Sequence, residues 1–139
     1  MSLSMKAAGS LFVAGFVVHN ADHARRGVDA VTDHVVWAGT FVAIAAAVIL
    51  TLVFTDHPEA PLAAAAGGFG IAVGVSATHL LPDWGVLSDP LLDLSATSWV
   101  AVLAEIVGAI ALGFSGLRAG SWTSPRRPGR TTRSTAPLP

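Results

Sequence analysis

The feature that most constrains this chain is a series of long apolar segments that are almost free of charge. Residues 35–54 and 60–81 contain no charged side chain, and residues 95–117 contain only Glu105. A helix that crosses a bilayer needs roughly 20 mostly apolar residues. Each of these three segments therefore predicts a membrane-spanning helix.

A fourth span is predicted at the N-terminus, where the pattern is weaker. Residues 7–18 are uncharged but short, and they reach the length of a span only as part of residues 3–22. The same stretch resembles a signal peptide, with Lys6 as its basic part and residues 11–18 as its apolar core. The His-Asn-Ala-Asp sequence that follows is a poor cleavage context, so a retained first helix is favoured.

Composition agrees with a protein that resides in the lipid bilayer. Of the 139 residues, 53% are hydrophobic and only 12% are charged, whereas soluble domains contain about a quarter charged residues. The net charge of −1 gives no indication of nucleic-acid binding. The chain has no cysteine, which excludes disulfides, thiolate metal sites and cysteine nucleophiles.

Short connections between the predicted helices favour antiparallel neighbours. We therefore expect an all-α integral membrane protein, with four transmembrane helices in an up-down bundle formed by residues 1–120. Residues 121–139 are rich in Ser, Thr, Pro, Gly and Arg. This composition predicts a disordered tail.

Basic residues predict the orientation of the bundle. The side that holds both termini has six of them: Lys6, Arg118, Arg126, Arg127, Arg130 and Arg133. The opposite side has only Arg25 and Arg26. The positive-inside rule then predicts a multi-pass protein of the cell membrane with both termini in the cytoplasm.

Small residues predict close contacts between the helices. The third segment contains Gly67, Gly68, Gly70 and Gly74, and the last two have the GxxxG spacing of close helix pairs. Packing alone explains these glycines. The same spacing is compatible with a homo-oligomer or with a larger membrane complex.

Ionisable side chains collect at the predicted outer ends of the spans. Such residues are costly near a bilayer and are therefore candidates for a functional site. The candidates are His19, Asp22, His23, His34, His79, Asp83 and Glu105.

Helical spacing places several of these candidates together. His19, Asp22 and His23 share one helix face, and His79 and Asp83 are separated by four residues. Glu105 is expected roughly 10 Å below the outer boundary, beneath the histidines.

This pattern predicts a transition-metal site, because imidazole and carboxylate ligands suit zinc, iron or copper. The expected primary ligands are His19, His23 and His79, with Glu105 as a fourth ligand or general base. Supporting roles fall to Asp22, His34 and Asp83. An open coordination position would let the metal activate water or bind a redox substrate. The sequence assigns no catalytic residue.

Several alternatives stay open. A haem between His19 and His79 is less favoured, because small residues leave little room for a porphyrin. A metal-free, proton-linked transporter or an accessory subunit of a membrane complex would use the same polar residues. A hydrolase based on Ser76 and His79 lacks the Gly-x-Ser-x-Gly turn. The plainest alternative is local: Asp33 caps the second helix, and Asp22 pairs with the neighbouring arginines.

Overall fold

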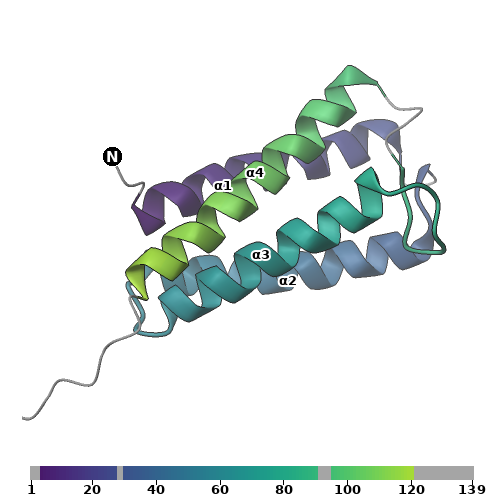
Figure 1. Ribbon diagram of the computed structural model, residues 1–139. Helices are drawn as coiled ribbons and strands as arrows, with labels where there is room; N and C mark the ends of the chain where they lie inside the picture. Colours follow the sequence, from purple (N-terminus) through teal and green to yellow (C-terminus); the bar gives the residue numbers. More distant parts are fainter. Residues whose placement is uncertain (1–3, 28–29, 91–94, 121–139) are drawn as a thin grey trace, which may run out of the picture.

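The computed structural model describes residues 4–27, 30–90 and 95–120. Within these ranges the chain forms four helices and no strand: α1 (Met5–Arg26), α2 (Asp33–Phe54), α3 (Ala60–Leu80) and α4 (Ala96–Ala119). The helices alternate in direction, so the start of α1 and the end of α4 lie at the same end of the bundle (Figure 1). The predicted all-α, up-down arrangement is confirmed, while the predicted tail at residues 121–139 lies outside the described residues.

Hydroxyl side chains begin three of the helices. The side-chain oxygens of Ser4, Thr32 and Ser95 each accept a hydrogen bond from the backbone N–H three residues later, which satisfies a donor that the first turn leaves free. Asp33 is the first helical residue of α2 rather than its cap, because Thr32 holds that position. In α3 a proline occupies the first turn instead, where its missing N–H costs nothing.

Three of the helices, α2, α3 and α4, are long and apolar enough to cross a membrane. Helix α1 falls short of this, although its 22 residues equal the length of α2. The reason lies in its last two turns, which contain the polar residues His19, Asn20, Asp22, His23, Arg25 and Arg26.

Helix α4 is central and α2 is peripheral. In the most apolar stretch of each helix, 56% of the α4 residues are buried but only 17% of those in α2. Helix α4 packs against both α1 and α3, whereas α2 packs on α3 and has little contact with α1. The outward side of α2 is apolar and fits a lipid environment, with Val36, Trp37, Phe41, Ile44 and Val48 exposed.

Glycines bring the backbones of α1 and α3 close to that of α4. An added Cβ would lie 2.5–2.7 Å from a backbone atom of the neighbouring helix at four positions: Gly15, Gly68, Gly108 and Gly116. At the predicted pair, Gly70 and Gly74, no atom of the described ranges lies within 4 Å of either added Cβ. Gly70 lies about 200° around the helix axis from Gly68, so the contact with α4 uses a different face of α3 from the one that the GxxxG spacing indicated.

Candidate metal centre

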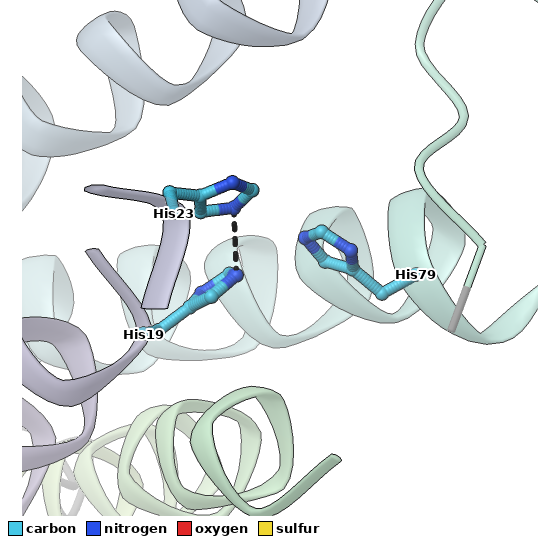
Figure 2. A group of neighbouring side chains, drawn as sticks. All are labelled: His19, His23 and His79. Atoms are coloured by element: carbon cyan, nitrogen blue, oxygen red, sulfur yellow. Dashed lines mark hydrogen bonds between the residues drawn. The ribbon is translucent and has the colours of Figure 1, made fainter. Parts of the chain in front are cut away.

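Three histidine side chains from two helices meet at the end of the bundle farthest from the N-terminus. His19 and His23 lie one turn apart near the end of α1, and His79 lies in the last turn of α3. One nitrogen of each ring lies within 4.8 Å of the other two. Figure 2 shows the three rings turned toward one another, with the Nε2 atoms of His19 and His23 3.0 Å apart. The expected primary ligands therefore form one cluster.

Hydrogen bonds at Nδ1 orient two of the three rings. The Nδ1–H of His19 donates to a carboxylate oxygen of Glu105, and the Nδ1–H of His79 donates to the backbone carbonyl of Asp89 at 2.8 Å. His19, His79 and Glu105 are all buried. With the proton held on Nδ1, the Nε2 lone pair of each ring is left for a metal ion, as in many metal-binding histidines.

His23 has a different partner. Arg26 donates from Nη2 to Nδ1 of His23 at 2.9 Å. Arg26 lies beyond the first predicted span, and its hydrogen bonds to Asp89 raise the pKa of the guanidinium further, so it always acts as a donor. His23 must then carry its proton on Nε2 and donate it to His19. The hydrogen bonds form a chain with one direction, from Arg26 through His23 and His19 to Glu105.

The cluster can reach the geometry of a metal site with small movements. Zinc–nitrogen bonds of about 2.0–2.1 Å in a tetrahedral site place the ligand atoms about 3.3 Å apart, so the widest pair has to close by no more than about 1.5 Å. Coordination through Nε2 of His23 requires its proton to move to Nδ1 and its contact with Arg26 to end. Arg26 keeps its two hydrogen bonds to Asp89, at 2.7 and 3.2 Å.

Glu105 lies beside the cluster rather than within it. Its carboxylate contacts Nδ1 of His19, whereas the nitrogen of that ring nearest to His23 is Nε2. Glu105 therefore occupies the position of a carboxylate that fixes the tautomer and orientation of a ligating histidine. This is a different place from the fourth-ligand position that the sequence indicated.

Asp22 does not belong to the histidine cluster and pairs with arginines instead. Its carboxylate lies 2.7 Å from Nη2 of Arg25 and 3.3 Å from Nε of Arg26. The carboxylate is buried, while the side chain of Arg25 is half exposed. Asp22 contacts Arg26, which in turn contacts His23. The ion pair of Asp22 with the neighbouring arginines, one of the alternatives drawn from the sequence, is therefore present in the structure.

Two further candidates lie outside the cluster. His34 is exposed and makes no hydrogen bond or ion pair within the described ranges. Asp83 is also exposed, and its carboxylate accepts a hydrogen bond from the backbone N–H of Gly85 at 3.3 Å. The proline before Asp83 ends the helical course that would have kept it on the face of His79.

Asp89 contacts the candidate site, and sequence reasoning missed it. It belongs to the segment between α3 and α4, which folds back so that the N–H of Asp89 donates to the carbonyl of Thr78. From there Asp89 contacts both His79 and Arg26. Residues 79 and 89 are not related by any helical spacing. The one signal in the sequence was Arg26, because an arginine at the membrane boundary needs an acidic partner such as Asp89.

Comparisons with protein-family models, with curated proteins and with solved structures find no match to this chain.

Proposed function

We propose that this protein is a multi-pass membrane protein that binds one transition-metal ion through His19, His23 and His79. The observation that supports this proposal most is the convergence of three imidazole nitrogens within 4.8 Å of one another at one end of the bundle. Two of the rings have their remaining nitrogen fixed by an oxygen acceptor, as ligating histidines do.

The three imidazole donors limit which metal ions fit the site. Three neutral imidazoles without sulfur suit zinc, copper or ferrous iron, and they leave one position open in a tetrahedral site. Haem fits less well: the rings of His19 and His79 lie edge to face with centroids 4.8 Å apart. A haem iron would instead need the two rings on opposite faces of a porphyrin plane.

We further propose that the site opens to the cell exterior, with both termini in the cytoplasm. This follows from the excess of basic residues on the terminal side. Because the chain has no cysteine, single-cysteine variants test the orientation directly. A membrane-impermeant maleimide should label V86C in intact cells but not H57C, which lies in the loop at the opposite end. The reverse pattern would refute the orientation.

The metal proposal is tested by elemental analysis of the detergent-purified protein, isolated without added metal or chelator. We expect about one transition-metal ion per chain in the natural protein and in H34A, whose altered histidine is exposed. H79A should lose the metal while keeping its helical circular dichroism. A folded, metal-free natural protein that also binds no added zinc would overturn the proposal.

A second candidate function rests on the direction of the hydrogen-bond chain. In the absence of a metal, the chain from Arg26 to Glu105 links the outer end of α1 with a carboxylate buried in α4. Such a chain suits a proton-linked transporter. If this alternative holds, E105Q abolishes proton-coupled transport by the reconstituted protein, and elemental analysis finds no metal.

A further inference from the structure

A cavity of about 640 Å³ extends from the histidine cluster between α1, α2 and α3. Volumes on the order of 300–1,000 Å³ are typical of sites for small ligands. The cavity lies where α2 has little contact with α1. His19, His23, His79 and Glu105 all line it, so the candidate metal site forms one of its corners.

The rest of the cavity is mainly apolar. Its walls include Phe16, Val35, Val42, Val75 and Leu87. Asn20 and Thr40 also line it, but each donates its side-chain hydrogen bond to a backbone carbonyl of its own helix. An occupant therefore meets strong polar partners at the histidine corner and a largely apolar surface elsewhere.

Three glycines line this space, and two of them, Gly39 and Gly74, lie inside helices. An added Cβ at Gly39 of α2 or at Gly74 of α3 would meet no atom of the described residues within 4 Å, and both glycines line the cavity. Gly70, one turn before Gly74, is equally unobstructed but does not line it. The chain thus contains a matched pair of positions for a test.

The histidine corner also has an unused ligand atom. His79 is 97% buried, since only 3% of its surface is accessible, and its Nε2 has no hydrogen-bond partner among the described residues. A divalent metal on three neutral imidazoles has a charge of +2, and the carboxylate of Glu105 is already engaged by His19. The open position of such a metal favours an anionic oxygen ligand that enters from the cavity.

We infer that the cavity binds a long-chain carboxylic acid, with its carboxylate on the metal and its hydrocarbon chain between α1, α2 and α3. This inference rests on the proposed metal site. A carboxylate provides the anionic oxygen, and an unbranched chain suits apolar walls that contain no further charge.

The test measures binding of radiolabelled palmitate to the protein in lipid nanodiscs, with metal content determined on the same samples. We expect saturable binding of one palmitate per metal-loaded chain. G74L should weaken palmitate binding at least tenfold and keep the metal, whereas G70L should change neither. H79A should lose both. Hexadecanol, which has the same chain without the charge, should bind at least tenfold more weakly than palmitate.

The two proposals fail in different ways. Metal-loaded protein that binds no palmitate, or that binds hexadecanol equally well, would overturn the ligand inference and leave the metal site standing. Equal effects of G74L and G70L would place the ligand outside the cavity and overturn the inference as well. A protein without metal would overturn the proposed function, and palmitate binding to it would refute the metal–carboxylate contact.

Discussion

Replacing Gly15 with alanine should force α1 and α4 apart beside the candidate metal site. The added Cβ would lie 2.5 Å from the carbonyl oxygen of Ala104 and 2.7 Å from the backbone nitrogen of Glu105. Ordinary contacts of this kind begin at 3.4 Å, so the helices have to separate by about 0.9 Å. Neither obstructing atom belongs to a flexible side chain, and the strain cannot be relieved by a change of rotamer.

Overpacking of this kind costs about 1–3 kcal/mol, which corresponds to a five- to 150-fold change in the unfolding equilibrium. His19 lies one turn after Gly15, so the same separation moves its ring away from Glu105 and weakens metal binding. The assay is unfolding of the detergent-solubilised protein by a denaturing detergent, followed by tryptophan fluorescence. A chelator competition measures metal affinity on the same samples.

The matched control is G70A, which adds the same methyl group to α3 at a place where no atom from the described part of the chain lies within 4 Å. We expect its free energy of unfolding to equal that of the natural protein or to exceed it by up to about 1 kcal/mol, because alanine favours a helix more than glycine does. If G15A proved as stable as G70A and bound metal equally well, the close approach of α1 to α4 at Glu105 would be refuted.

Three other substitutions separate the roles of charged groups. E105Q should lower metal affinity about 10–100-fold without abolishing binding, because it removes the charge that orients His19; unchanged affinity in a chelator titration would contradict this role. D89A should reduce the free energy of unfolding by about 3 kcal/mol, since it leaves Arg26 without its main partner at a site where both side chains are only 10% exposed. By contrast, K6A should change it by less than about 1 kcal/mol, because the ion pair of Lys6 is exposed. Denaturant titrations check both values, and equal losses in the two variants would refute the distinction.

The helices could be predicted from the sequence because each apolar segment is a local property. Residues 35–54 lie entirely within α2, and most of their exposed side chains are apolar. Helical spacing also explains why His19 and His23 share a face, since the two belong to one continuous helix. The position of His79 opposite them follows from the alternating direction of the helices.

The parts that were missed depend on segments without a period. Asp89 reaches His79 only because the segment after α3 folds back, and no repeat in the sequence records that path. The GxxxG spacing of Gly70 and Gly74 indicated the wrong face, because a motif reports the separation of two small residues but not the direction in which they point. Gly68, which does contact α4, has no second glycine four residues before or after it.

The half of the bundle between Glu105 and the C-terminal end of α4 affects how ions pass between the histidine cluster and solution. There the side chains of Phe12, Ala64, Ala109 and Leu112 are fully buried, and glycines bring the helix backbones into contact. Among the described residues, no string of polar groups leads through this half. If the bundle spans a membrane as proposed, an ion that reaches the histidines must return to the compartment from which it came. The occupancy of the site would then report the metal concentration of one compartment alone, whatever the concentration in the other.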